Sequence, residues 1–211
     1  MGALLFAPIL RRYNRSMQIF LARHGQSRWQ VSRVDGDWDS PLTELGQKQA
    51  QHLGQWAASA DGIQFQHIRV SPLRRARQTA APLAETLAQP VTLDPNLREA
   101  EFLVSDHLPS STDPLSPYQI PELSPTYNEF KEQVAAGWAA LVADASAADG
   151  PVLGVAHGGF IATVLRHIVG SDWVSFWIYN ASLQQLEWKR GRWHLITLNQ
   201  WDHLPPPLRT F

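Results

Sequence analysis

The fold is decided by residues 19–25, Ile19-Phe20-Leu21-Ala22-Arg23-His24-Gly25. The four apolar residues that open this stretch have the length and composition of a buried β-strand. A cation, an imidazole and a flexible glycine follow, and open α/β sheets build their ligand crevice just beyond the carboxyl ends of such strands. The apolar run 152–156 is likewise followed by His157-Gly158. Two strands that each end in His-Gly would bring both imidazoles to the same edge of one sheet.

The composition excludes several classes of protein. The 211 residues are 44% hydrophobic, which is enough to bury a large core. Lys plus Arg number 18 and Asp plus Glu 19, so the net charge of −1 argues against a surface for nucleic acid or for an anionic membrane. Cysteine is absent, which excludes disulfide scaffolds, cysteine zinc sites and thiol nucleophiles. Nine Trp with only 18% charged residues leave room for an apolar contact surface and a homodimer.

The first 16 residues do not fit the pattern of the rest. We expect residues 1–16 to be a disordered extension or a misassigned start, with the fold beginning at Met17. The arginines of this segment follow its apolar run 3–10, whereas a signal peptide carries its positive charge before the run. The run is also too short to span a bilayer. With no other membrane-length apolar run, the sequence predicts a soluble cytoplasmic protein.

Strand and helix patterns alternate through residues 17–211, which we interpret as a single domain. The predicted strands are 19–22, 65–70, 91–93 and 152–156, followed by a hairpin of 183–188 and 193–198. The predicted helices are one after the capping residue Thr43 as far as Ala57, one from Leu73 to about Ala88 with Ser71 as N-cap, and two over 127–147 and 160–169. This order predicts a three-layer α/β/α fold, with a mainly parallel sheet, helices on both faces and an antiparallel edge.

Two segments rich in proline interrupt this pattern. From about 95 to 126, which we call the lid segment, periodicity disappears among prolines and serines. A long irregular segment in a compact domain is usually functional or disordered, so we expect a substrate-covering lid, with a passive insertion as the alternative. The tail Pro205-Pro206-Pro207 is expected to be extended and exposed.

Arginines accompany the two His-Gly stretches. Ser71-Pro72-Leu73-Arg74-Arg75-Ala76 places two guanidinium groups in the first turn of a predicted helix, directly after a strand. Leu97-Arg98-Glu99 follows the third predicted strand. All would face the crevice at the carboxyl ends of the strands. Guanidinium groups and the free N–H groups of a helix start both complement phosphate oxygens, so the sequence predicts an anion pocket.

These motifs resemble those of the histidine phosphatase superfamily, also called the phosphoglycerate mutase-like family. The resemblance runs in order from residue 18 to about 200. It rests on Arg23-His24-Gly25-Gln26-Ser27-Arg28-Trp29, Asp39-Ser40-Pro41-Leu42-Thr43, the stretch 71–80, Leu97-Arg98-Glu99 and Ala156-His157-Gly158. It implies a phosphoglycerate mutase-like fold and phosphoryl-transfer chemistry that needs no metal and no cofactor.

The resemblance also implies roles for individual residues. His24 would attack phosphorus to form a phosphohistidine that water later hydrolyses, and Glu99 would protonate the leaving oxygen and then activate the water. Glu101 and Asp106 remain alternatives for that acid. The residues expected to hold the phosphoryl group are Arg23, Gln30, Arg75, His157 and Gly158. Arg74 and Arg77 are expected to be solvated or to face the lid instead.

Three departures from the family pattern bear on the substrate. Gln30 stands where Asn is usual, Asp35 stands where a loop glutamine is usual, and the common Gly-x-Trp-Glu-Gly after the acid motif is absent. Residues 99–130 contain no Lys or Arg. A mutase must hold the carboxylate of a phosphoglycerate, and the family's mutases place cations in this lid. We therefore predict a phosphatase for small phosphomonoesters with a less anionic, partly apolar leaving group.

Other readings stay open at this point. The alternatives are phosphoglycerate mutase-type transfer, a phosphoprotein phosphatase and a phosphate-binding module without turnover. The apolar lid residues expected near the substrate are Phe102, Leu103, Leu108, Tyr118 and Ile120, and the residues expected at the pocket mouth are Trp29, Trp38 and Trp177. His107 is a further candidate for a substrate contact.

Overall fold

The computed structural model describes residues 16–32, 38–59, 61–113 and 122–211. The extension expected over 1–16 therefore lies, apart from Ser16, outside the described residues. The same holds for Asp35 and for Tyr118 and Ile120 of the lid segment.

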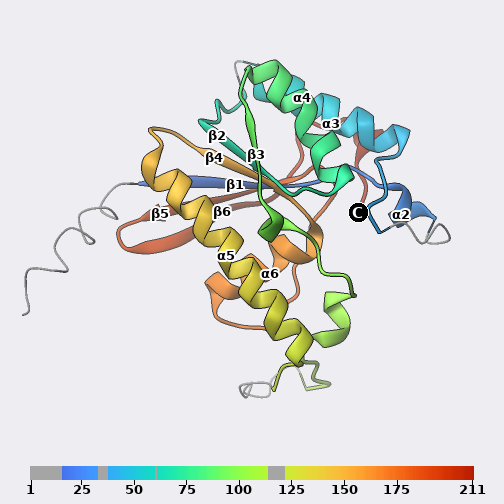
Figure 1. The fold of residues 1–211 in the computed structure, drawn as a ribbon, viewed down its shortest axis with the longest axis vertical. Helices are drawn as coiled ribbons and strands as arrows, with labels where there is room; N and C mark the ends of the chain where they lie inside the picture. Colours follow the sequence, from blue (N-terminus) through green and yellow to red (C-terminus); the bar gives the residue numbers. More distant parts are fainter. Residues whose placement is uncertain (1–15, 33–37, 60, 114–121) are drawn as a thin grey trace, which may run out of the picture.

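In the described part of the chain, one sheet of six strands runs through the centre of the molecule in the order β3-β2-β4-β1-β5-β6 (Figure 1). The strands are β1 Met17–Arg23, β2 His67–Val70, β3 Val91–Leu93, β4 Val152–Ala156, β5 Leu183–Lys189 and β6 Arg192–Gln200. The first four are parallel where they pair, and β5 and β6 add the antiparallel edge. The predicted fold class is confirmed.

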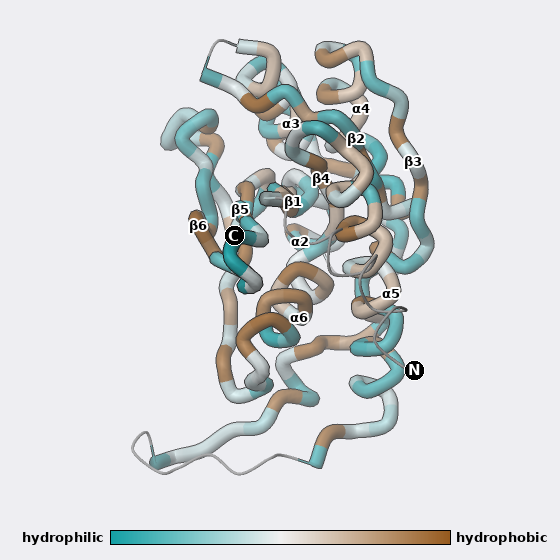
Figure 2. The backbone as a smooth tube through the Cα atoms, turned by 90° about the vertical axis from the view of Figure 1, so that its left-hand side faces the viewer, coloured by the Kyte–Doolittle hydropathy of each residue, from teal (hydrophilic) through white to brown (hydrophobic). Residues whose placement is uncertain are grey.

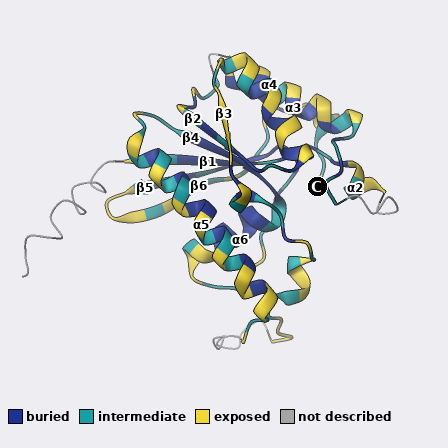
Figure 3. Ribbon diagram, viewed as in Figure 1, coloured by how far each residue is buried: buried dark blue, intermediate teal, exposed yellow. Residues whose placement is uncertain are grey.

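Helices cover both faces of this sheet. The helices α3 Glu44–Ala57 and α4 Arg74–Leu87 lie on one face, and α5 Pro125–Ala147 and α6 Gly158–Val169 lie on the other (Figure 1). Strand β1 serves both cores: Ile19 and Leu21 pack with α5 and α6, while Phe20 and Ala22 pack with α3 and α4. This alternation follows from the two-residue period of a strand. The strands at the centre are correspondingly buried (Figure 3), and α6 is mainly hydrophobic (Figure 2).

Local sequence explains where several helices begin. The side chain of Thr43 accepts a hydrogen bond from the Gly46 amide at 3.0 Å, which confirms the predicted cap of α3. Ser124 caps α5 in the same way through the Tyr127 amide. The loop after β1 also contains a short helix, α2 Arg28–Val31, which no periodic pattern in the sequence indicates.

Two predictions about local structure are wrong. The helix expected to be capped by Ser71 begins at Arg74 with Leu73 as its N-cap. The Ser71 hydroxyl lies 2.8 Å from His157 Nε2 and accepts a longer hydrogen bond, 3.4 Å, from the Leu73 amide, so it does not reach the amides of the first helical turn. The proline-rich tail is exposed as expected but not extended, since Pro206–Leu208 form a 3₁₀ turn, η4. This tail returns to α3, where the Gln49 amide donates to the Leu208 carbonyl at 2.6 Å.

The described part of the lid segment is more ordered than its sequence suggested. It contains two 3₁₀ turns, η2 Pro95–Leu97 and η3 Val104–His107, before α5 begins at Pro125. Phe102, Val104 and Leu108 pack against the same hydrophobic core as α5 and α6. Among the described helices, none combines the length and the apolar character needed to cross a membrane.

Candidate active site

The two imidazoles meet because their strands are neighbours. Strands β1 and β4 pair in parallel with Arg23 opposite Ala156, so the next residue of each strand is a histidine at the same edge of the sheet. The ring centroids of His24 and His157 lie 5.0 Å apart with their planes inclined at 59°. Both side chains are buried, with 4% and 0% of their surface exposed. The predicted juxtaposition is confirmed.

His24 is held as a neutral base with one unprotonated nitrogen. Its Nδ1 lies 2.7 Å from the Gly25 carbonyl oxygen, and because a carbonyl can only accept, Nδ1 carries the proton. The lone pair is then on Nε2, which accepts a hydrogen bond from Arg75 Nε at 3.2 Å. Burial, reinforced by the charges of Arg75 and Arg23, lowers the pKa of His24 well below its usual range. This nitrogen is therefore available as a nucleophile at neutral pH.

Gly25 allows the backbone that follows His24 to pass close to α3. A Cβ atom at this position would lie 2.6 Å from the Gly46 carbonyl oxygen, a distance that no side chain allows. The Gly25 amide also donates to Thr79 Oγ1 of α4 at 3.0 Å. These contacts fix the carbonyl group that sets the tautomer of His24.

Two arginines flank the imidazoles. Arg75 at the start of α4 is 4% exposed, and its Nη1 donates to the Trp38 carbonyl at 2.6 Å. Arg23 Nη1 donates to the Ile178 carbonyl, while its buried Nε has no partner among the described residues. Burial lowers the pKa of Arg23 to about 10, offset in part by Glu99, so Arg23 stays charged at neutral pH. Both predicted phosphate ligands lie beside His24.

His157 is oriented by Ser71, which the sequence predicted to be the N-cap of a helix. Its Nε2 lies 2.8 Å from Ser71 Oγ, and its buried Nδ1 has no partner in the described part of the chain. Burial, followed by the neighbouring His24 and Arg75, lowers the pKa of His157 well below its usual range. Buried polar atoms are normally paired, so the unpaired His157 Nδ1 and Arg23 Nε are suited to the oxygens of an anion.

Glu99 sits against the start of α6. Its carboxylate accepts hydrogen bonds from the amides of Gly159 at 2.8 Å, Phe160 at 3.1 Å and Ala100 at 3.2 Å. Burial raises the pKa of Glu99, opposed by the hydrogen bonds from Gly159 and Ala100 and by the charges of Arg75 and Arg23. A carboxyl with a raised pKa can donate a proton, which is what a general acid requires.

The two alternative acids lie elsewhere. Glu101 is exposed and pairs with Arg98 at 3.1 Å. Asp106 is exposed on η3, where its carboxylate accepts a hydrogen bond from Ser105. Of the three acidic candidates, the geometry favours Glu99.

A cavity of about 230 Å³ opens beside Glu99. Its apolar wall includes Trp29, Trp38, Phe102, Leu103, Leu108 and Phe176. Trp29 and Trp38, which were expected at the pocket mouth, both line the cavity and meet edge to face with their ring centroids 5.4 Å apart. Trp177 is not among the lining residues and is 71% exposed, because its neighbour Phe176 takes the inward position. His107 also lies outside the lining and bonds to Ser124 instead.

Gln30 has a bridging position between α2 and the last residues of the chain. Its amide nitrogen donates to Asn180 Oδ1 and to the Phe211 carbonyl, both at 3.1 Å. Its oxygen accepts from the Ser27 amide at 2.9 Å. None of these partners belongs to the imidazole and arginine cluster, so a phosphate contact of Gln30 stays a prediction. Gly158 does line the cavity, at the start of α6.

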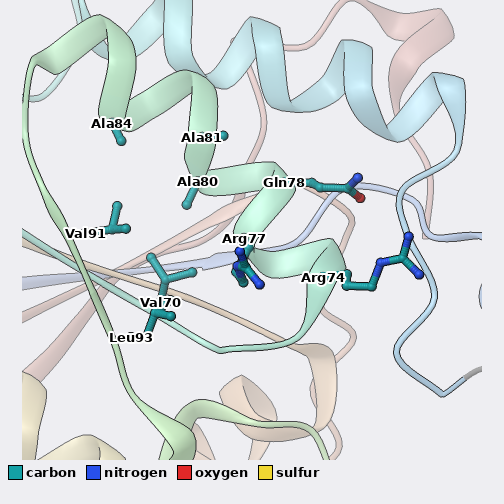
Figure 4. Close-up of a pocket in the computed structure, with 9 residues that line it drawn as sticks. All are labelled: Val70, Arg74, Arg77, Gln78, Ala80, Ala81, Ala84, Val91 and Leu93. Atoms are coloured by element: carbon teal, nitrogen blue, oxygen red, sulfur yellow. The ribbon is translucent and has the colours of Figure 1, made fainter.

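A larger hollow of about 580 Å³ lies between α4 and β3 (Figure 4). Alanines of α4 face Val91 and Leu93 of β3 across it, with Arg74 and Arg77 near the start of the helix. The imidazoles, Arg23, Arg75 and Glu99 do not line it. Arg74 and Arg77 are exposed, as expected.

The described residues contain no group of three His, Cys, Asp or Glu side chains that could hold a metal ion. The site instead combines a neutral nucleophile, anion-binding cations and a carboxyl that can donate a proton. Such a set can transfer a phosphoryl group in two steps through the nucleophile.

Comparisons with known proteins identify the family. The family model described as "Histidine phosphatase superfamily (branch 1)" matches residues 19–200. A "Probable phosphoglycerate mutase GpmB" of Klebsiella pneumoniae is 29% identical over 90% of this chain and 96% of its own length. A Yersinia enterocolitica relative of the same name is 36% identical over 57% of this chain, and the chain spans about half of that relative, 51%.

Solved structures give the same picture. A mycobacterial glucosyl-3-phosphoglycerate phosphatase superposes with a TM-score of 0.63 at 27% identity, over 88% of this chain and 100% of that one. A phosphoglycerate mutase from Bacillus anthracis superposes with a TM-score of 0.71 over 92% of this chain and 97% of that one. At 20% identity the latter shows the fold alone.

Proposed function

The chain belongs to the histidine phosphatase superfamily, and from this membership we propose that it is a metal-independent phosphatase that hydrolyses small phosphomonoesters. The observation that carries the proposal is the pair of imidazoles 5.0 Å apart, beside Arg23, Arg75 and the carboxyl of Glu99. Such a cluster supplies a nucleophile, a binding site for the phosphoryl oxygens and a proton donor.

In the first step, His24 Nε2 forms a bond to phosphorus as the bond to the leaving oxygen breaks. Arg75 Nε, which contacts this nitrogen in the free enzyme, then moves its hydrogen bond to a phosphoryl oxygen. The free donors of Arg23 and His157 bind the other oxygens. Glu99 gives its proton to the leaving oxygen, so that an alcohol departs rather than an alkoxide.

In the second step, water attacks the phosphohistidine. Glu99, now a carboxylate, takes a proton from the water as its oxygen bonds to phosphorus and the bond to Nε2 breaks. The amides of Gly159 and Phe160 stabilise the carboxylate between the two steps. Inorganic phosphate leaves, and His24 and Glu99 return to their starting protonation states.

The cavity beside Glu99 supports a phosphatase over a mutase. Its wall is largely aromatic and aliphatic, and the lid residues that form part of it contribute no cation. A volume of about 230 Å³ also suits a small molecule better than a phosphorylated protein segment. Mutase activity is the second candidate, because relatives carry that name and because one arginine, Arg166, does line the cavity.

One comparison of rates tests the proposal. We expect the purified protein to release phosphate from alkyl and aryl phosphates faster than it interconverts phosphoglycerates under the same conditions. Mutase turnover that exceeds hydrolysis would favour the second candidate. Binding of phosphate esters with neither activity would favour a binding module.

A further inference from the structure

Arg166 lies at the far end of the cavity that begins at Glu99. Gly158, Ala162 and Arg166 all line this cavity and are spaced four residues apart, so the cavity follows one face of α6. The eight steps from Gly158 to Arg166 span about 12 Å of helix. Arg166 is 3% exposed, which is unusual for an arginine.

The contacts of Arg166 leave part of its guanidinium group free. Nε donates to the Tyr127 hydroxyl at 2.9 Å, and Nη2 donates to Thr163 Oγ1 at 2.7 Å. Both acceptors are neutral. Asp172 is the one described carboxylate within ion-pair distance, and its Oδ1 lies 3.9 Å from Nε, too far for a hydrogen bond. Nη1 has no hydrogen-bond partner among the described residues.

Asp172 is already engaged by other donors. Lys131 Nζ lies 2.6 Å from its Oδ2, and the Tyr127 hydroxyl donates to its Oδ1 at 3.0 Å. The cluster therefore contains two cations, Arg166 and Lys131, and one anion. A buried cation without a matching anion is costly, and an anionic group that enters the cavity would balance the excess charge.

The wall between Glu99 and Arg166 limits what can carry that anion. Phe102, Leu103 and Phe176 present apolar surface along this path. We propose that Arg166 binds a carboxylate at the far end of a flat, apolar leaving group, in a phosphomonoester whose phosphate lies at His24. This inference rests on the proposed phosphatase function and names the substrate class of the same site. The carboxylate would take the free N–H groups of a guanidinium that Tyr127 and Thr163 hold in place.

The separation between Glu99, at the start of α6, and Arg166 sets the length of such a substrate. A guanidinium side chain on a helix leans toward the helix start, so it reaches back from Arg166 toward Glu99. We infer that the leaving group has the length of an aromatic ring with a short chain, because it must run along this face of α6 before it meets Arg166.

A matched pair of substrates tests this assignment. The probes are the phosphate ester of para-hydroxyphenylpropionate and its methyl ester, which keeps the ring and chain but lacks the charge. We expect the wild type to prefer the carboxylate by about ten- to hundredfold in kcat/KM, the range of a charge-assisted hydrogen bond. Arg166→Gln should abolish this preference. The control Arg98→Gln removes an arginine outside the cavity and should keep it.

A purely structural role for Arg166 gives a different result. Arg166→Gln would then lower kcat/KM for both esters by the same factor, and this outcome, or a wild type without preference, overturns the inference. If Arg166→Gln does not fold, Arg166→Lys takes its place. A preference reduced in Arg166→Lys supports the inference, and an unchanged one overturns it.

Binding measurements separate this inference from the proposed function. If the wild type hydrolyses neither ester, the phosphatase proposal fails, and the Kd values of both esters are measured with His24→Ala by calorimetry. Tighter binding of the carboxylate that depends on Arg166 still supports the subsite. Equal Kd values for the two esters overturn it.

Discussion

A methyl group at Gly159 should displace the proton donor without altering it chemically. A Cβ atom at Gly159 would lie 2.4 Å from Oε1 of Glu99 and 3.1 Å from its Cδ. It would also lie 3.1 Å from Val104 Cγ2, so the carboxyl group has little room beside the helix start. Gly159→Ala is therefore expected to push Glu99 away from the amides that hold it.

The size of the effect follows from the role of the proton donor. General acid catalysis contributes about 10²–10⁴-fold, so we expect kcat/KM for an alkyl phosphate to fall by that factor. This loss corresponds to about 3–5 kcal/mol of transition-state stabilisation. The nitrophenolate of p-nitrophenyl phosphate leaves without a proton, and for it we expect a loss of less than about tenfold.

The assay measures kcat/KM for each of the two substrates, because kcat/KM reports the step in which the leaving group departs. Gly158→Ala is the matched control, since its Cβ atom would lie 3.5 Å from Arg23 Nε, an ordinary contact. It should keep the wild-type ratio between the substrates. An equal loss for both substrates in Gly159→Ala, with an unchanged melting temperature, would refute the assignment of Glu99 as proton donor.

Three further predictions concern pH, orientation and stability. Burial raises the pKa of Glu99 and lowers that of His24, so kcat/KM for an alkyl phosphate should be highest on the acid side of neutrality. It should fall as rising pH deprotonates Glu99, and Glu99→Gln should lack this decline. Ser71→Ala frees His157 Nε2 and should lower kcat/KM about tenfold, or roughly 1.4 kcal/mol, with wild-type substrate ratios. Leu53→Ala empties a fully buried site and should lower the free energy of unfolding in urea by about 2–5 kcal/mol.

The sheet could be predicted because its signals are local. Residues 19–22 and 152–156 are apolar runs that polar residues follow, and their burial on both faces of the sheet explains that composition. A histidine follows each strand directly, His24 after Arg23 at the end of β1 and His157 after Ala156 at the end of β4. Once the runs are parallel neighbours, the meeting of His24 and His157 follows without further information.

The position of Ser71 could not be predicted in this way. A serine followed by proline before a helical pattern fits an N-cap, and that interpretation uses only neighbours in the chain. Its actual partner, His157, is 86 residues away, and the preference of the hydroxyl for this imidazole appears only when β2 and β4 lie side by side.

The charge of the cavity beside Glu99 could not be predicted from the sequence either, because it depends on Arg166. Residues 99–130 contain no Lys or Arg, and from this the sequence predicted a leaving group with little negative charge. The structure brings a cation into the cavity from α6, two turns beyond the helix start. In the sequence Arg166 is only a basic residue in the last turn of an apolar helix, where it would interact with the helix dipole. Its contacts with Tyr127 and Thr163 depend on the packing of α5 against α6.

Trapping of the phosphoenzyme tests the central claim most directly. After rapid mixing with a phosphate ester and a quench in alkali, we expect a phosphoryl group that is stable to alkali, labile to acid and located on the peptide containing His24. His24→Ala should carry none. Phosphate release without a phosphoenzyme, or a phosphoryl group on His157 instead, would contradict the account.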